Sequence, residues 1–421
     1  MDQINKIVVN ENWKSAEPSV IGTLYVDGGR GKQIISFEYA EEWINDLNNN
    51  LKLDPDLGLF KGRQYCSEDK KMFGVFEDSC PDRWGRLLMK RREAILAKKE
   101  ERKPRNLTDI DFLLGVYDET RMGGLRFQTS ENGEFLSNDK ELATPPWTTL
   151  RKLETASLAF EKNDDGMEEK WLKQLLAPGS SLGGARPKAS VLAPDTSLWI
   201  AKFPSKHDDT NIGAWEMVVH DLAKLCGLDV PEAKFENFSK AGSTFLVKRF
   251  DRGRQDRRIH FVSAMTLLGK KDGAGTADGS SYLDIASIIR QNSATPKKDL
   301  QELWNRIVFN MAVSNTDDHL RNHGFILRDG GLCLSPLFDV NPNIYGDSLS
   351  LNVDSSDNRI DFELALSVAK LFDLKGIQAE SSLKNIKAIV EENWRKLAKQ
   401  YGLSRGEIEN MAPAFDMRYK D

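Results

Sequence analysis

Three side chains in the C-terminal half of the chain have types and a spacing that suit phosphoryl transfer. Asp317 is followed five positions later by Asn322, and Asp339 comes seventeen residues after Asn322. In a kinase loop of this layout, an Asp takes the proton from the attacking hydroxyl, and an Asn and a second Asp hold Mg²⁺ against the phosphates of ATP. Mg²⁺ needs only one or two protein oxygens besides phosphates and water. We therefore predict Asp317 as the catalytic base and Asn322 and Asp339 as Mg²⁺ ligands.

Each of these residues also has a simpler structural interpretation. Asp is a common turn residue, so Asp317 could cap or turn the chain after a helix, and Asn322 and Asp339 could do likewise. Asp318 is the rival base within the loop, but the five-residue spacing to Asn322 favours Asp317. Asp339 follows the mostly apolar residues 334–338, which disfavours a purely solvated position.

A lysine at the end of an apolar strand is the predicted phosphate anchor. Lys202 lies near the end of the stretch 198–203, where an unpaired ammonium group would be costly to bury. Glu216, on a helix predicted over 211–226, is a candidate partner that would hold Lys202 in position. An exposed helical Glu is the equal alternative, because helix surfaces are rich in Glu.

A glycine-rich segment precedes this strand. Gly183 and Gly184 allow close backbone approach and expose N–H groups to a phosphate. The segment is a weak signal alone, and it is not a Walker A loop, because no Gly-Lys-Ser or Gly-Lys-Thr follows. Lys188 could add a second positive charge near the nucleotide. A phosphate on Ser180 or Ser181 would instead add roughly −2 charge where the phosphates of ATP must bind.

Two histidines flank the Asp317 loop. A hydrogen bond that fixes the loop's shape is the simpler interpretation of His319 and His323, and His319 is also kept as a nucleotide-binding candidate. Metal binding by the two is disfavoured, because no third ligand is apparent.

A basic segment spans residues 83–105. A solvated helix face is the default interpretation, because Glu93, Glu100 and Glu101 dilute the positive charge. A docking surface for DNA or for an acidic partner is the alternative.

Composition limits the class of protein. The 421 residues are enough for two or three domains, and the net charge of −5 gives no global attraction to nucleic acid or an anionic membrane. The four cysteines form no CxxC pair, which favours a reducing compartment over a zinc site or a disulfide framework. We find no signal pattern and no apolar run of membrane-spanning length, so we expect a soluble cytoplasmic protein.

The chain divides into three predicted parts. These are an N-terminal subdomain at 1–145, a kinase N-lobe with the glycine-rich loop and the lysine at 146–252, and a helical C-lobe at 253–421. Strands are predicted at 20–26, 33–37, 198–203 and 245–251, with a hairpin over 324–334. Helices are predicted at 41–51, 81–103 with Pro81 in its first turn, 109–117, 211–226 before Gly227, 300–312 and 383–397.

The chain resembles the HipA family of serine/threonine kinase toxins from bacterial toxin–antitoxin systems. The resemblance rests on the order and spacing of several segments, which are 181–188, 199–204, 247–252, 315–322 and 334–340. They cover residues 177–342 densely, and the front end matches the family's N-terminal subdomain more loosely. The resemblance implies an α+β, protein-kinase-like bilobal fold, with a strand-rich N-terminal subdomain and a mainly helical C-terminal lobe.

The same resemblance implies ATP and Mg²⁺ in the cleft between the lobes. Asp317 would be the base, Asn322 and Asp339 the metal ligands and Lys202 the phosphate anchor, and the strand 247–250 would hydrogen-bond to adenine through its backbone. The nucleotide-binding candidates are Gly183, Gly184, Lys188, Lys202, Glu216, Lys248, Phe250 and His319. Family members phosphorylate a serine of their own glycine-rich loop, which ejects the loop and inactivates the kinase. Ser181 is the matching position here, with Ser180 as the second candidate.

Partners follow from the resemblance as well. Characterised relatives act on aminoacyl-tRNA synthetases and are neutralised by a small helix-turn-helix antitoxin that binds operator DNA. We expect a protein substrate of this kind, a similar antitoxin, DNA contact mainly through that antitoxin, and no membrane. The sequence departs from the family at Gly183-Gly184-Ala185-Arg186, where Ala-Gly-Ala-Gln is frequent. The role of the extra charge on Arg186 stays open.

The leading hypothesis is therefore an ATP-dependent serine/threonine kinase that limits itself by phosphorylation at Ser181. A small-molecule phosphotransferase is the first alternative, because antibiotic and sugar kinases share a similar Asp-to-Asn loop. A DNA-bound regulatory protein with a dead kinase domain is the second. Retention of Lys202, Asp317, Asn322 and Asp339 argues against the second alternative.

Overall fold

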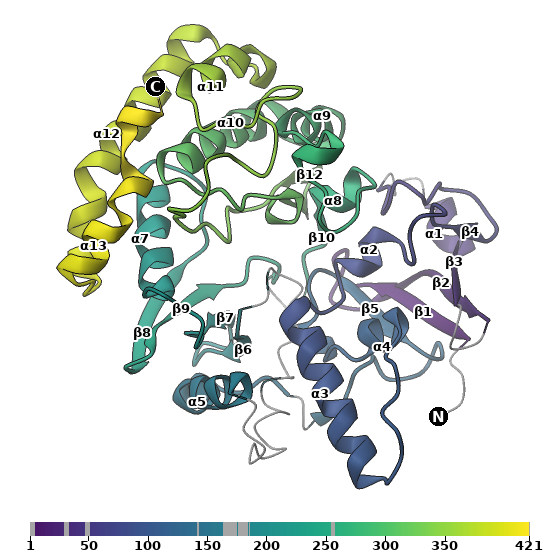
Figure 1. Ribbon diagram of the computed structural model, residues 1–421. Helices are drawn as coiled ribbons and strands as arrows, with labels where there is room; N and C mark the ends of the chain where they lie inside the picture. Colours follow the sequence, from purple (N-terminus) through teal and green to yellow (C-terminus); the bar gives the residue numbers. More distant parts are fainter. Residues whose placement is uncertain are drawn as a thin grey trace. The chain divides into compact units, whose positions relative to one another are not determined.

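The chain folds into two compact units (Figure 1). The computed structural model describes residues 5–28, 33–46, 51–140, 143–162, 175, 184, 186–253 and 257–420. The first unit contains Met1–Ala201 and Arg249–Val262, and the second contains Lys202–Lys248 and Ser263–Asp421. Compactness is only one criterion for a domain, so the domain boundaries expected at residues 145 and 252 stay predictions.

The first unit is built on an antiparallel sheet. Among the described residues its strand order is β4-β3-β2-β1-β5, and Figure 1 shows these strands in purple and blue. The strands are β1 (Lys6–Glu11), β2 (Ser19–Asp27), β3 (Ile34–Tyr39), β4 (Gln64–Tyr65) and β5 (Leu125–Gln128). Leu24 and Val26 of β2 are buried, while Thr23 and Tyr25, which alternate with them, are partly exposed, because one face of the sheet covers an apolar core. The strands predicted at 20–26 and 33–37 are confirmed as β2 and β3.

The first unit also contains helices, of which α1, α2 and α4 contribute buried residues to the core of the sheet. These helices are α1 (Glu41–Asn45), α2 (Gly74–Glu77), α3 (Arg83–Lys99), α4 (Asp109–Leu114) and η1 (Asp118–Thr120). The side chain of Asp82 accepts a hydrogen bond from the Gly85 backbone N at 2.8 Å and so caps α3. Pro81 therefore lies before the cap, and its predicted place in the first turn was wrong. The unit also holds η3 (Trp147–Thr149), α5 (Leu150–Glu161), β6 (Lys188–Leu192) and most of β7 (Leu198–Lys202).

A buried cluster of ion pairs ties Arg249, Asp251, Arg252 and Arg258 to the rest of the first unit. Asp251 accepts hydrogen bonds from Arg249 at 2.5 Å, from Arg252 at 2.7 Å and from the Gly123 backbone N at 2.8 Å. Burial alone would raise the pKa of Asp251, but the two guanidinium groups lower it below its ordinary value. Arg258 pairs in turn with Asp118 at 2.8 Å.

The second unit is mainly helical. Its strands are β8 (Ala233–Ser239) and β9 (Gly242–Lys248), which pair antiparallel, and the hairpin β11 (Gly324–Arg328) and β12 (Gly331–Leu334). Its longer helices are α7 (Ile212–Leu225), α9 (Tyr282–Asn292), α10 (Pro296–Ala312) and α12 (Gly376–Gln400). Shorter ones are α8 (Ala264–Leu267), η4 (Thr276–Asp278), η5 (Leu320–Asn322), α11 (Phe362–Val368), η6 (Ala369–Phe372), α13 (Arg405–Met411), η7 (Ala412–Phe415) and η8 (Met417–Tyr419). Strand β10 (Phe261–Ser263) contains residues that are assigned to both units.

Helix α10 is the central element of the second unit and delivers the chain to the predicted catalytic loop. Leu300, Leu303, Trp304 and Ile307 are completely buried, as their helical spacing predicted. The Trp304 indole N–H donates to the backbone O of Ala365 at 2.9 Å, which satisfies its polar group inside the core. Within the described parts of the chain, no helix is both long and apolar enough to span a bilayer.

Candidate active site

The second unit brings three predicted side chains into direct contact. The Nζ of Lys202, at the end of β7, lies 2.5 Å from Oε1 of Glu216 and 2.6 Å from Oδ1 of Asp339. Lys202 and Glu216 are buried, while the Asp339 side chain remains 26% exposed. Burial alone would lower the pKa of Lys202, but the carboxylates of Asp339 and Glu216 raise it above its ordinary value. The ammonium group therefore stays charged at every physiological pH.

Helix α7 sets the position of Glu216. Asn211 caps the helix, because its side-chain oxygen accepts a hydrogen bond from the Ala214 backbone N at 3.3 Å. Near its start, Gly213 lies directly on β9, and a Cβ there would come within 2.0 Å of the Ser243 backbone O. This close approach of helix and strand places Glu216, one turn further on, inside the unit rather than on an exposed helix surface.

The loop after α10 directs its two adjacent carboxylates to opposite sides. Asp318 is 1% exposed, and its Oδ2 accepts hydrogen bonds from the Tyr282 hydroxyl and the Asn310 amide, each at 2.7 Å. The same oxygen lies 2.9 Å from Nε2 of His323. Burial alone would raise the pKa of Asp318, but His323 and the Tyr282 hydrogen bond lower it. Asp317 is exposed, as a base that must meet a substrate hydroxyl has to be.

The side chain of Asn322 is held by the loop and presents a buried oxygen. Its Nδ2 donates to the backbone O of Asp317 at 3.1 Å, which fixes the orientation of the amide. The residue is 3% exposed, and its Oδ1 is buried with no hydrogen-bond partner among the described residues. A buried orphan oxygen is costly unless something binds it. Together with the carboxylate of Asp339, this oxygen fits the preference of Mg²⁺ for one or two protein oxygens.

The chain after the β11–β12 hairpin returns to this loop. The backbone N of Asn343 donates to the Ser314 backbone O at 3.0 Å, and its side-chain amide donates to the Thr316 hydroxyl at 2.7 Å. Ser350 donates to the Thr316 backbone O at 2.7 Å. These bonds hold the segment that carries Asp339 against the loop that carries Asp317 and Asn322. Asp339 itself has a φ of 58°, a strained conformation for a residue with a side chain.

Three further candidates for nucleotide binding make contacts outside the cluster of Lys202, Glu216 and Asp339. Lys248, on β9, pairs with Glu232 at 3.5 Å. Phe250 lies in the first unit with its ring centroid 6.2 Å from that of Phe261. His319 is half-buried, and its Nδ1 is buried with no hydrogen-bond partner among the described residues.

The base of the glycine-rich segment forms a buried ion pair within the first unit. The Nζ of Lys188 lies 2.7 Å from Oδ2 of Asp82 and 3.1 Å from the backbone O of Gly184. The Trp84 indole N–H donates to the backbone O of Lys188 at 3.0 Å. The predicted Ser180, Ser181 and Gly183 lie outside the described residues.

Sequence reasoning missed the partners that hold these residues. Asp82 lies 106 positions before Lys188, and Tyr282 lies 36 positions before Asp318. No local signal could have found such pairs. The buried position of Asn310 inside an apolar helix was a partial signal, because a buried amide needs a hydrogen-bond partner.

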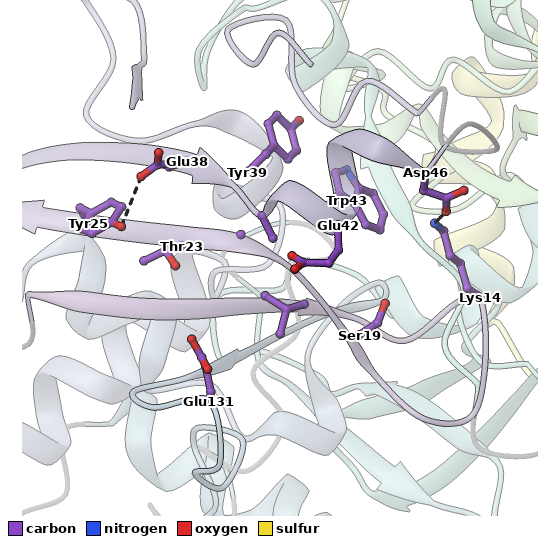
Figure 2. Close-up of a pocket in the computed structure, with 13 residues that line it drawn as sticks. Lys14, Ser19, Thr23, Tyr25, Glu38, Tyr39, Glu42, Trp43, Asp46 and Glu131 are labelled. Atoms are coloured by element: carbon purple, nitrogen blue, oxygen red, sulfur yellow. Dashed lines mark hydrogen bonds and ion pairs between the residues drawn. The ribbon is translucent and has the colours of Figure 1, made fainter. Parts of the chain in front are cut away.

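A separate pocket of about 650 Å³ lies on the sheet of the first unit. Figure 2 shows the carboxylates of Glu38, Glu42 and Glu131 around it. On one side Lys14 pairs with Asp46 at 2.7 Å. None of the residues predicted for phosphoryl transfer is among the described residues that line this pocket.

The fold and the site geometry define an α+β protein of the protein-kinase-like class. The family model described as the HipA-like C-terminal domain matches residues 180–401, which is more than half of the 421 residues. The chain therefore belongs to the HipA-like family.

Individual relatives are more distant. A kinase-named protein of Haemophilus influenzae is 28% identical over 179 residues, which cover 38% of this chain and 52% of the relative. The serine/threonine-protein kinase toxin HipA of Shewanella oneidensis is 24% identical over 308 residues, which cover 64% of this chain and 66% of the relative. The matches thus span about half to two thirds of the relatives' lengths.

A solved structure shares the fold across almost the whole chain. It is the Shewanella oneidensis MR-1 complex of HipA, HipB and operator DNA, with a TM-score of 0.62 and 17% sequence identity. The match covers 97% of this chain and 95% of the solved chain. At this identity the likeness establishes the fold alone.

Proposed function

We propose that this chain is an ATP-dependent serine/threonine protein kinase of the HipA type. The observation that supports this most strongly is the contact of Lys202 with both Glu216 and Asp339. A strand lysine held by a helix glutamate, next to a metal-binding aspartate, is how kinases hold the phosphates of ATP. The Asp317 loop is held against the same aspartate segment, so one set of side chains can serve both phosphate binding and proton transfer.

The proposed roles follow from exposure and charge. Mg²⁺-ATP supplies the γ-phosphoryl group when it is bound. Asp317 takes the proton of the substrate hydroxyl while the new P–O bond forms and the bond to the leaving ADP breaks. Asn322 and Asp339 would hold Mg²⁺ through their side-chain oxygens. Lys202 offsets negative charge that develops on the phosphates.

Finer parts of the proposal rest on the family resemblance. We propose Ser181, or Ser180 beside it, as the site of self-inactivating phosphorylation, and a protein such as an aminoacyl-tRNA synthetase as the target. The solved HipA relative is bound to HipB and operator DNA. A HipB-like helix-turn-helix antitoxin is accordingly the proposed partner, with DNA contacted mainly through it.

The test is phosphate transfer from ATP by the wild type and by Asp317→Asn. Asp329→Asn, which changes an exposed Asp in the β11–β12 turn, is the matched control. Loss of a general base lowers the rate by roughly 10²- to 10⁴-fold, so Asp317→Asn should lose transfer to that extent and Asp329→Asn should not. Mass spectrometry then locates the phosphate.

Two outcomes would contradict the proposal. Unchanged transfer by Asp317→Asn would remove the assigned base. Phosphate found on small molecules but never on Ser180, Ser181 or a protein would favour a small-molecule phosphotransferase instead.

A further inference from the structure

The carboxylate of Asp318 is the centre of a hydrogen-bond network behind the predicted catalytic loop. Its Oδ2 receives bonds from α9 through Tyr282 and from α10 through Asn310, and it contacts His323 after η5. The backbone O of His323 accepts in turn from the Ala264 backbone N at 2.8 Å. Helices α9 and α10 and the end of the loop therefore meet at a single oxygen atom of Asp318.

The network continues from Asp318 toward the Asp339 segment through three asparagines. The Oδ1 of Asn310 accepts a hydrogen bond from the Asn315 side chain at 3.0 Å, and the Asn315 backbone N donates to the Asn310 backbone O at 2.8 Å. The Oδ1 of Asn315 accepts from the backbone N of Asn341 at 3.4 Å. Asn341 lies two residues after Asp339, so an unbroken series of hydrogen bonds joins Asp318 to that segment.

We propose that Asp318 is a positioning residue for the phosphoryl transfer proposed above, on which this inference rests. Its anchored side chain fixes the backbone of the loop so that the adjacent Asp317 is presented outward. Through Asn310 and Asn315 the same carboxylate fixes the spacing between Asp317 and the Asp339 segment. A misplacement of a reacting group by about 1 Å can cost on the order of 10²-fold in rate, so such an anchor matters to catalysis.

The alternative role, a catalytic base, does not suit Asp318. The residue is 1% exposed, and its Oδ2 already contacts three polar groups. A base needs hydrogen-bond reach to a substrate hydroxyl. A purely apolar packing role does not suit it either, because removal of the carboxylate would leave buried donors on Tyr282 and Asn310 without an acceptor.

The experiment compares Asp318→Asn with Asp299→Asn. Asp299 is a buried Asp of α10 that accepts from Ser293 at 2.6 Å and from the Leu334 backbone N at 2.9 Å, so the control makes the same change at a buried site outside the loop. We expect Asp318→Asn to lower kcat by roughly 10²-fold and to change the Kd for Mg²⁺-ATP by less than about threefold. Asp299→Asn should leave kcat close to that of the wild type.

The pH profile separates positioning from proton transfer. If Asp317 is the base, the kcat of Asp318→Asn falls at low pH, on the acidic limb of the profile, in the same way as that of the wild type. Disappearance of that acidic limb, or a kcat equal to that of the wild type, would overturn the inference.

A measurement without nucleotide keeps the inference independent of the kinase proposal. Hydrogen exchange of peptides from residues 314–323 should be at least about tenfold faster in Asp318→Asn than in the wild type, because the loop loses its anchor. If the wild type shows no ATP turnover, the proposed function fails and this exchange result still decides whether Asp318 anchors the loop. Equal exchange in the two proteins would overturn it.

Tyr282→Phe is the milder variant if Asp318→Asn does not fold. It removes one donor and leaves the charge of Asp318 with Asn310 and His323. We expect a change in kcat and in exchange of the same sign but smaller. The double variant Tyr282→Phe/Asp318→Asn should have a kcat no lower than that of Asp318→Asn alone, because both changes act through one network.

Discussion

Replacement of His260 by an apolar residue should make the free energy of unfolding of the first unit depend less on pH. His260 is 1% exposed, and its ring lies 4.5 Å from that of Trp13, centroid to centroid. Neither ring nitrogen has a hydrogen-bond partner among the described residues. Burial lowers the pKa of His260 from 6.5 to about 4, and no other cause contributes to the shift.

The sign of the effect follows from proton linkage. The unfolded chain takes up the proton as the pH falls below 6.5, while the folded protein takes it up only near pH 4. Acid therefore favours the unfolded state across this window. Between pH 7 and pH 5, His260 should cost the folded state about 2 kcal/mol, since one pKa unit corresponds to roughly 1.4 kcal/mol.

The assay is chemical denaturation of the wild type and of His260→Leu at the two pH values. Hydrogen exchange of peptides from β1 and β5 identifies the transition that belongs to the first unit. Between pH 7 and pH 5, the free energy of unfolding of the wild type should fall by about 2 kcal/mol more than that of His260→Leu. His207→Leu, at an exposed histidine, should behave like the wild type. An equal loss in the wild type and His260→Leu would refute the reasoning.

Two further changes test close contacts, one in each unit. Gly213→Ala would drive a Cβ to within 2.0 Å of the Ser243 backbone O. We therefore expect thermal unfolding to show a destabilisation of about 2 kcal/mol or more. A melting temperature equal to that of the wild type would contradict the close contact between helix and strand. Lys188→Met would remove the ammonium group that lies 2.7 Å from the buried carboxylate of Asp82, and should cost about 3–5 kcal/mol by denaturant titration. The double variant Asp82→Asn/Lys188→Met should recover much of that loss, and an additive loss would show that the two side chains do not act as a pair.

The elements predicted correctly are those whose signals are local. The apolar spacing in α10 indicated its buried face, and Gly227, which follows α7, has a φ of 79° that favours glycine. The β11–β12 turn was equally clear, because Gly330 and Gly331 both adopt positive φ. Each signal spans only a few residues, so it can be read without knowledge of the fold.

Elements that depend on distant partners were not predicted. Strands β1 and β5 were missed, because Val9 of β1 pairs with Phe127 of β5 far along the chain. Helix α12 begins at Gly376, well before its predicted start at 383, because its first turns carry few apolar residues.

The same distinction holds for the candidate site. The residue types and order of Lys202, Asp317, Asn322 and Asp339 could be picked out from spacing. Their surroundings could not. Asp317 and Asp318 have the same side chain. The hydrogen bonds from Tyr282 and Asn310 show that the carboxylate of Asp318 is the buried one.

The arginine–carboxylate cluster makes the first unit discontinuous along the gene. Arg249 donates to the Thr120 backbone O at 2.5 Å, and Arg258 pairs with Asp118, so residues 249–262 complete a structure begun before residue 201. A fragment that stops at residue 201 would leave Asp118 without one of its guanidinium partners. Anyone who dissects the chain has to carry 249–262 along, for example spliced through a short linker. During translation, likewise, the N-terminal part cannot be finished until Arg258 has emerged from the ribosome.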